Sequence, residues 1–317
     1  MGLLKDKSQA LDATHRVMVV GGNGFIGRHV VQHLTQTGVE VLVFDMISQT
    51  DRPSNTKQIV GSITDETHFA SAVTGCQTVV FLANSSLPGS SPTNLSDEIH
   101  AHVHATVKAA ELCRAAGVQR FLFASSGGTV YGYSSDAPLS EEMSTHPRNA
   151  YGVSKLTIEH YLRILEMQGD MKTVSLRISN PYGEGQRAIR NQGFIAAAMH
   201  SAISGQPITI WGDGSVQRDF IHVSDLANAF VAAIACPAPP QVANIGSGQA
   251  LSLLDVIRMV ECCTGRELRV HFEPGRAIDV KRNVLNIRRA RETLGWQPRI
   301  AIDEGLRSTA KWWMEQA

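Results

Sequence analysis

Residues 16–27 read Arg16-Val17-Met18-Val19-Val20-Gly21-Gly22-Asn23-Gly24-Phe25-Ile26-Gly27, an apolar run that ends directly in a glycine-rich turn. Gly21, Gly24 and Gly27 have GxxGxxG spacing, and an amphipathic stretch of helical length follows. Such a turn needs glycine for positive φ angles and for close approach of the backbone to a pyrophosphate, which the helix N-terminus attracts. Turns collect glycine in any case, but this position between a strand and a helix predicts a dinucleotide-binding loop.

Short apolar runs alternate with stretches of helical length through the first half of the chain. The predicted strands are residues 16–20, 41–44, 78–82, 120–124 and 174–178, and the predicted helices are residues 25–37, 65–73, 98–116 and 149–167. Continuously apolar strands suit a parallel sheet that is covered on both faces. We therefore expect an α/β protein with a Rossmann, doubly wound parallel sheet.

The regular alternation ends after Asn180, where glycine and proline become frequent. Helical segments are predicted at residues 195–204, 252–263 and 303–315 without regular strand partners, while residues 241–245 read as a late strand of the main sheet. We expect a second, smaller α/β substrate lobe built from discontinuous pieces. The predicted division is residues 16–178 plus 219–249 for the dinucleotide-binding domain and residues 179–218 plus 250–317 for the second lobe.

The composition excludes several classes of protein. The 317 residues are 43% hydrophobic and 18% charged, a globular balance, and 29 Lys and Arg against 29 Asp and Glu give no net charge. Nucleic-acid binders normally carry a positive excess. Five cysteines without CxxC spacing indicate neither a disulfide framework nor a zinc site. No stretch approaches the roughly 20 apolar residues of a membrane span. We expect a cytoplasmic protein with no nucleic-acid or membrane partner and no metal.

Asp45 ends the second predicted strand, about 18 residues after Gly27. This is close to the spacing of the carboxylate that binds the ribose diol of a dinucleotide. A carboxylate repels a 2′-phosphate, and the next residue is Met46 rather than arginine, so the pattern favours NAD over NADP. The alternative is a solvated aspartate at a strand end.

Tyr151 and Lys155 lie four residues apart and hence on one face of a predicted helix. The YxxxK spacing is frequent by chance, but here it follows a strand that ends in Ser125 and Ser126. A phenol of pKa about 10 needs a fall of roughly three units to act as a base at neutral pH, about 4 kcal/mol. One positive charge about 4 Å away supplies that much at an effective dielectric near 20, so we expect Lys155 to lower the pKa of Tyr151.

With these motifs the chain resembles the extended short-chain dehydrogenase/reductases, and within them the nucleotide-sugar epimerases and dehydratases, over residues 16–317. The order and spacing of the motifs along the chain carry the resemblance. The further matching motifs are Val130-Tyr131-Gly132, Leu176-Arg177-Ile178-Ser179-Asn180-Pro181-Tyr182-Gly183, Trp211-Gly212-Asp213-Gly214, Arg218-Asp219-Phe220, Asn244-Ile245-Gly246-Ser247-Gly248, Pro274-Gly275-Arg276 with Asp279, and Leu294-Gly295-Trp296.

The resemblance implies a bound NAD and a nucleoside diphosphate sugar as substrate, most simply a UDP-sugar. It implies further cofactor contacts at Phe25, Ile26, Ser62, Ile63, Leu82, Ala83 and Ile178. In the second lobe it implies sugar or diphosphate contacts at Asn180, Arg218 and Arg276, a role consistent with the bidentate fit of guanidinium to phosphate. Asp279 would hold a ribose or orient Arg276. Asn283 falls near the position beside the C2 substituent of the sugar, where a modest side chain admits an N-acetyl group.

The chain departs from the family pattern at several positions. The catalytic serine or threonine of the family usually lies four residues before the tyrosine of the VYG motif, where this chain has Gly127. Ser126 is the candidate replacement, with Thr129 as the alternative. Gly128-Thr129 stands where dehydratases carry an Asp-Glu pair, so the general acid for dehydration is missing. Ser62 replaces an aspartate that contacts adenine, and His102 takes a common asparagine position, where a structural role is the simpler interpretation.

These expectations combine into an NAD-dependent nucleotide-sugar 4-epimerase. Tyr151 would take the proton of the C4 hydroxyl, Ser126 or Thr129 would steady that oxygen, and Lys155 would hold the ribose of NAD. The alternatives are a 4-keto-sugar reductase or a decarboxylase on the same scaffold, and a non-catalytic dinucleotide-binding protein. Helices near residues 102–116 and 150–167 are apolar on more than one face, which predicts a homodimer.

Overall fold

A seven-stranded parallel sheet forms the centre of the molecule. The computed structural model describes residues 14–53, 55–84, 95–133, 135–188, 193–276 and 280–316. The strand order is β11-β6-β5-β4-β1-β2-β3, and every pairing is parallel. The strands are β1 (Arg16–Val20), β2 (Glu40–Asp45), β3 (Thr56–Val60), β4 (Thr78–Phe81), β5 (Arg120–Ser126), β6 (Lys172–Ile178) and β11 (Val242–Ile245). This order confirms the predicted Rossmann fold, whose ligands bind where the order reverses between β1 and β4.

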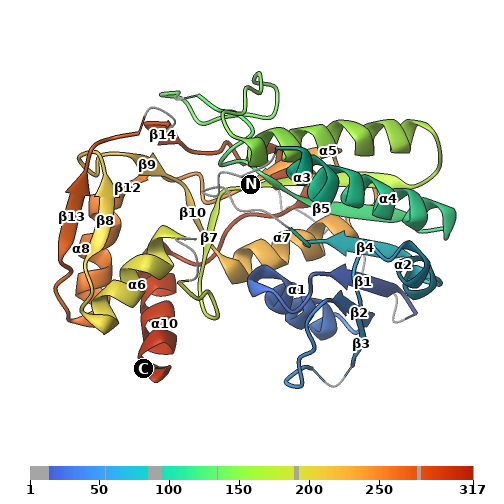
Figure 1. The fold of residues 1–317 in the computed structure, drawn as a ribbon, viewed down its shortest axis with the longest axis horizontal. Coiled ribbons are helices and arrows are strands. Elements are labelled where there is room, and N and C mark those ends of the chain that lie inside the picture. Colours follow the sequence, from blue (N-terminus) through green and yellow to red (C-terminus); the bar gives the residue numbers. More distant parts are fainter. Residues whose placement is uncertain are drawn as a thin grey trace, which may run out of the picture.

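Helices cover both faces of the sheet (Figure 1). On one face, α1 (Phe25–Gln36) and α7 (Val223–Ala235) pack their apolar sides against the strands in one buried cluster. On the other, α2 (Glu66–Val73), α4 (Ala105–Ala115) and α5 (Ala150–Met167) form a second cluster. Because both faces are dry, the strands read as nearly continuous apolar runs in the sequence.

A smaller lobe lies beside the carboxyl end of the sheet (Figure 1). The helices α6 (Phe194–Ser204), α8 (Leu253–Thr264) and α10 (Ile302–Glu315) enclose its apolar core. Three short sheets complete the region: β7 (Asn180–Tyr182) with β10 (Phe220–His222), β8 (Ile208–Trp211) with β13 (Val270–Glu273), and β9 (Gln217–Arg218) between β12 (Leu251–Ser252) and β14 (Arg282–Asn283). The helix α9 (Arg288–Leu294) returns to the main sheet, where it packs near β11.

The structure differs from the sequence prediction in several elements. The helix predicted over residues 98–116 is α3 (Leu95–Glu98), a π-helical segment η1 (Ile99–His104) and α4 in succession. A π-helix inserts a residue into the helical repeat and often marks a functional site. The strand β3 was not predicted because, at the sheet edge, it exposes polar side chains instead of an apolar run. The helix α7 was also missed.

Two general features bear on the class of protein. In the described parts of the chain, no helix is both long enough and apolar enough to cross a membrane. All five cysteines are free thiols, and Cys76 and Cys113 are buried.

Candidate active site

The glycine turn after β1 is shaped for close approach of a ligand to the backbone. Gly21 has φ of +80°, and a Cβ there would lie 2.9 Å from the backbone nitrogen of Ala83. A Cβ on Gly27 would overlap the carbonyl oxygen of Gly21. Helix α1 begins at Phe25 with Gly24 as its N-cap, and no side chain among the described residues caps it. The free helix end and its dipole fit a pyrophosphate, so this turn meets the requirement for binding NAD.

Asp45 lies at the end of β2 and turns its carboxylate toward the glycine turn. Its two oxygens accept hydrogen bonds from the backbone nitrogens of Asn23, at 3.0 Å, and Ile47, at 3.1 Å. The neighbouring side chains of Met46 and Ile47 are exposed and uncharged. A negative group here disfavours a 2′-phosphate, which supports NAD as the dinucleotide.

The remaining predicted cofactor contacts gather at the same edge of the sheet. Leu82 and Ala83 follow β4 directly, and the backbone nitrogen of Leu82 donates to Val20 O at 2.9 Å. Ser62 follows β3, where its hydroxyl contacts that of Thr64 at 2.7 Å, and Ile63 packs on the buried cluster below. Ile178 ends β6 and stands opposite Ser126 of β5 in the strand register. Phe25 and Ile26 form the first turn of α1.

Tyr151, Lys155 and Ser126 come together at the carboxyl end of β5. Helix α5 starts one residue before Tyr151, where the side chain of Asn149 caps the Gly152 nitrogen at 2.8 Å. The Lys155 ammonium donates to Ala124 O at 2.8 Å and lies 5.4 Å from the centroid of the Tyr151 ring. The Ser126 hydroxyl interacts with the Tyr151 phenol and opposes the rise of its pKa. The helix spacing therefore brings the phenol and the ammonium to the carboxyl end of β5.

The protonation states in the unliganded chain differ from the sequence expectation. Burial, with a further contribution from Glu98, raises the pKa of Tyr151 above its usual value, and only the Ser126 hydrogen bond opposes this. Burial lowers the pKa of Lys155 to about 7. The expected lowering of the Tyr151 pKa by Lys155 is thus wrong for the chain alone, because desolvation of the buried phenolate is the largest cause of the shift. Tyr151 is a neutral phenol here.

Gly127 occupies the family position of the catalytic hydroxyl for a steric reason. A Cβ at Gly127 would lie 2.6 Å from Cδ1 of Leu285, so a side chain there would require Leu285 to move. Its nitrogen donates to Ile178 O at 2.8 Å, which ties the turn to the sheet. The alternative residue, Thr129, is two positions further along and has its hydroxyl oxygen buried with no hydrogen-bond partner in the described structure. The Ser126 contact to Tyr151 favours Ser126 as the replacement.

A buried ion pair supports the strand end that carries Ser126. Arg177 on β6 donates to Glu159 on α5 through Nη2 at 2.7 Å and through Nε at 3.1 Å. Glu159 also accepts from the hydroxyl of Ser125. Arg177 further donates to the Tyr131 hydroxyl at 3.2 Å. The three elements β5, β6 and α5 are thereby locked together below the site.

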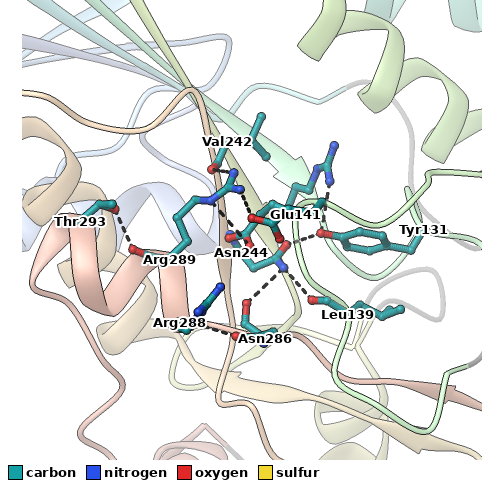
Figure 2. A network of polar contacts seen from close by, with 11 residues as sticks. Tyr131, Leu139, Glu141, Val242, Asn244, Asn286, Arg288, Arg289 and Thr293 are labelled. Atoms are coloured by element: carbon teal, nitrogen blue, oxygen red, sulfur yellow. Dashed lines mark hydrogen bonds and ion pairs between the residues drawn. The ribbon is translucent and has the colours of Figure 1, made fainter.

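Tyr131 links this pair to a second network, shown in Figure 2. Its hydroxyl donates to Asn244 at 2.7 Å, and the Asn244 amide donates to Leu139 O at 2.8 Å and Asn286 O at 3.2 Å. Glu141 accepts from the Asn244 backbone nitrogen at 2.7 Å, and its other oxygen pairs with Arg289 at 3.9 Å. Late segments of the chain thus fix the loop between Tyr131 and α5. Sequence reasoning cited Asn244 only as part of a motif.

The segment before α4 places two further polar side chains near Tyr151. His102 on η1 is 1% exposed, and its ring lies nearly parallel to that of Tyr151 with centroids 6.4 Å apart. Burial and Lys155 lower the pKa of His102 to about 3, so the imidazole is neutral. Glu98 at the end of α3 is 6% exposed and acts electrostatically on both Tyr151 and Lys155. Sequence reasoning missed Glu98. The sequence signal that could have identified Glu98 is its position four residues before His102 in the same predicted helix.

Predicted substrate residues lie where the second lobe meets the sheet. The Asn180 amide donates to Asp219 O at 2.8 Å, and Arg218 donates to Val280 O at 2.6 Å. Asn283 pairs with Arg218 across β14 and β9, and its amide donates to Gly127 O at 3.1 Å. Asn283 is 1% exposed, so its side chain packs against the turn next to Ser126.

Arg276 lies farther along the second lobe, with its guanidinium 4.4 Å from the ring centroid of Trp211. Asp279 falls outside the described residues.

Several buried polar atoms around Tyr151 have no hydrogen-bond partner in the described structure. They are His102 Nε2, Thr129 Oγ1, Ser179 Oγ and Asn283 Oδ1. Buried polar groups are normally paired, so such a group of atoms at one edge of a sheet fits a ligand rich in hydroxyls.

Comparison with known proteins identifies the family. The model of the NAD dependent epimerase/dehydratase family matches residues 17–246. This chain belongs to that family. The family assignment makes NAD the cofactor of this chain, which agrees with the glycine turn and Asp45.

Two sequence relatives and one solved structure match nearly the whole length of this chain. The dTDP-4-dehydro-6-deoxyglucose reductase of Escherichia coli is 32% identical, covering 92% of this chain and 95% of its own. The UDP-glucose 4-epimerase of Mycolicibacterium smegmatis is 31% identical, covering 95% and 99%. The structure of MoeE5 with UDP-glucuronic acid and NAD is 32% identical with a TM-score of 0.86, covering 95% of this chain and 100% of that one.

Proposed function

We propose that this family member is an NAD-dependent 4-epimerase of UDP-hexoses that works through a 4-keto sugar. The observation that carries the proposal is the contact of Tyr151 with Ser126, next to Lys155, at the sheet edge where the glycine turn and Asp45 bind the dinucleotide. Similar proteins are UDP-glucose 4-epimerases or bind UDP-glucuronic acid together with NAD.

Tyr151 is the proposed acid and base. It takes the proton from the C4 hydroxyl in the first half of the reaction and returns it to the C4 oxygen in the second. Ser126 donates a hydrogen bond to that oxygen, and Lys155 binds the cofactor ribose beside the phenol. When bound, NAD would supply the hydride chemistry at C4, with hydride return to the opposite face inverting that carbon, and a positive charge that favours the Tyr151 phenolate.

The two predicted domains would bind different ligands. Residues 16–178 and 219–249 would hold NAD, and residues 179–218 and 250–317 would hold the nucleotide sugar. In the second lobe, Arg218 and Arg276 would bind the diphosphate and Asn180 the sugar, and Asp279 would hold a ribose or orient Arg276. Asn283 would face the C2 substituent, where its carbonyl oxygen can accept a hydrogen bond from a hydroxyl or an N-acetyl group.

The test is a screen of UDP-, GDP-, CDP- and dTDP-sugars with the purified chain and no added cofactor, with epimers detected by NMR. We expect interconversion of a UDP-hexose pair and no net change in absorbance at 340 nm. The Tyr151→Phe variant should retain bound NAD and lose at least about 1,000-fold in kcat, at the upper part of the range for acid–base catalysis. Parent-like turnover in that variant would rule out the proposed role.

A 4-keto-sugar reductase is the second candidate. The neutral phenol of Tyr151 is already the proton-donating form that ketone reduction needs, and the Escherichia coli relative is a reductase. Stoichiometric loss of NADH absorbance with a 4-keto sugar, without epimer formation, would favour this candidate over the epimerase.

We further propose a homodimer formed through α5 and the adjoining α3. The exposed side of α5 carries Val153, Tyr161, Ile164 and Met167, and α3 and η1 add the exposed Leu95 and Ile99. Contiguous apolar side chains on a helix face are typical of a protein interface. Light scattering should give twice the chain mass of 34.4 kDa, and Ile164→Glu with Met167→Glu should return the monomer mass.

A further inference from the structure

The side chain of Asp219 lies where three segments that are far apart in the sequence meet. Asp219 connects β9 to β10 and is 0% exposed. Its Oδ1 accepts hydrogen bonds from the backbone nitrogen and the hydroxyl of Ser247, at 2.7 and 2.8 Å. Its Oδ2 accepts from the backbone nitrogens of Gly248, at 3.1 Å, and Leu285, at 3.2 Å. The segment after β11 and the segment after β14 are thereby fixed to one carboxylate.

The buried charge of Asp219 makes this arrangement costly to disturb. All four donors to the carboxylate are uncharged N–H or O–H groups. A buried charge is tolerated only when such donors surround it, so the segments must keep their places. Gly246 leaves room for the carboxylate, because a Cβ at that position would lie 2.5 Å from Oδ2. The two sequence motifs that contain Asp219 and Ser247 therefore meet in one contact.

The peptide groups of Asp219 hold two of the predicted sugar-binding residues. Its carbonyl oxygen accepts from the backbone nitrogen of Asn180, at 3.0 Å, and from the Asn180 amide, at 2.8 Å. Its nitrogen donates to the carbonyl oxygen of Asn283 at 3.1 Å. Asn180 and Asn283 are thus both attached to a residue whose side chain is itself fixed by four hydrogen bonds.

Two residues of one short segment, Asn283 and Leu285, touch the turn that carries Ser126. The Asn283 amide donates to Gly127 O at 3.1 Å. The Leu285 side chain lies against the same glycine, since a Cβ on Gly127 would be 2.6 Å from Cδ1 of Leu285. Both residues are also hydrogen-bonded to Asp219, one through its nitrogen and the other through its carboxylate. Displacement of this segment would therefore move the turn that carries Ser126.

We propose that Asp219 is a positioning residue of the active site, which holds Asn180, Asn283 and the turn at Ser126 in one arrangement. Its effect on turnover rests on the proposed epimerase function, whereas its effect on the turn is a property of the folded chain. Asp219 acts through its neighbours and does not itself contact the reacting atoms.

Asp219→Asn tests the proposal because it keeps the shape of the side chain. The amide turns an NH₂ group toward N–H donors, so the bonds on one side of the former carboxylate are lost. The Gly127 nitrogen, which donates to Ile178 O at 2.8 Å in the parent, reports on the turn. Its hydrogen exchange is followed by mass spectrometry of peptides covering residues 125–131. We expect exchange at least about 10-fold faster, relative to peptides covering β1 that report global opening.

Asp225→Asn is the matched control. Asp225 on α7 is 2% exposed, and its Oδ2 accepts from the backbone nitrogens of Arg299, at 3.0 Å, and Ile300, at 2.9 Å. This buried carboxylate also anchors a late segment, but not the segment that touches Gly127. The control should lose stability and leave exchange at Gly127 unchanged relative to β1. Parent-like exchange at Gly127 in Asp219→Asn, or equal acceleration in both variants, would overturn the proposal.

In an active enzyme, Asp219→Asn should lower kcat by about 10- to 100-fold, the scale of a misplaced catalytic group, and raise KM for the nucleotide sugar. A merely structural role would leave both constants of the folded fraction at their parent values. Since hydrogen exchange requires no turnover, faster exchange at Gly127 in a chain without epimerase activity would reject the proposed function and keep the role of Asp219.

If Asp219→Asn does not fold, Ser247→Ala decides. This variant removes the 2.8 Å bond from the hydroxyl and keeps the carboxylate with its backbone donors. Faster exchange at Gly127 relative to β1 would support the proposal, and parent-like exchange would overturn it.

Discussion

The region below Tyr151 and the region beside it differ in whether their buried polar groups are hydrogen-bonded within the protein. Below, Glu159, Arg177 and Ser125 satisfy one another within the protein. Beside it, the oxygens of Thr129 and Asn283 are buried without a hydrogen-bond partner in the described structure. The first region completes itself when the chain folds, whereas the second has hydrogen-bonding capacity left for a ligand. Substitutions in the first should therefore cost stability, and substitutions in the second should cost affinity or turnover.

The largest expected effect is at the buried ion pair. Arg177→Met leaves the Glu159 carboxylate buried without its partner and should lower the free energy of unfolding by about 3–5 kcal/mol. The double variant with Glu159→Leu should recover part of that loss, because it leaves no unpaired charge. Urea unfolding of the two single variants and the double variant measures this. A double variant as unstable as the sum of the singles would show that the pair is not coupled.

Lys155 should make stability depend on pH in a defined window. The pKa of Lys155 is about 7 in the folded chain, against about 10.4 unfolded, so the unfolded chain binds more protons between these values. Stability therefore rises with pH from about 7 to 10, by about 2–4 kcal/mol relative to Lys155→Met. Subtracting the Lys155→Met curve removes the opposing contribution of groups such as Tyr151. A flat difference across this window would contradict the burial of a charged lysine.

The glycine turn should tolerate no side chain at Gly27. In Gly27→Ala the new methyl group overlaps the Gly21 carbonyl, so the turn must open. We expect a loss of about 1–3 kcal/mol in stability, as for other overpacked sites, and loss of co-purifying NAD. Gly169→Ala is the control, since its nearest neighbour is the flexible Arg114 side chain at 3.4 Å. Retention of NAD by Gly27→Ala would show that the dinucleotide binds elsewhere.

The smallest expected effects on stability come from removing one hydroxyl group in each of the two regions. Tyr131→Phe removes hydrogen bonds to Asn244 and Arg177 and should cost about 1–2 kcal/mol in stability. Thr129→Val replaces a buried hydroxyl that has no partner in the described structure, so stability should change by less than about 0.5 kcal/mol or rise. Thermal unfolding of both variants decides the comparison. Equal losses would mean that Thr129 is satisfied within the protein after all.

The Rossmann half could be predicted from sequence because its signals are local. The glycine turn, Asp45 and the YxxxK spacing each act within one strand–turn–helix unit, and the apolar runs follow from burial on both faces. The edge strand β3 carried no such run and was missed.

The site was less predictable because its electrostatics depend on distant segments. The spacing of Tyr151 and Lys155 placed them on one face correctly, but the direction of the Tyr151 pKa depends on burial and on Glu98, 53 residues earlier. The tight contact of Gly127 with Leu285, which a late segment brings against the turn, could not be read from the sequence around Gly127.

The central claim is that the C4 hydride leaves the sugar and returns to it within one active site. UDP-hexose carrying deuterium at C4, incubated with the parent protein and excess unlabelled NADH, tests this most directly by NMR of the products. The account predicts the C4 epimer with the deuterium still at C4. Epimer that has lost its deuterium, or deuterium that appears in the free cofactor, would contradict it.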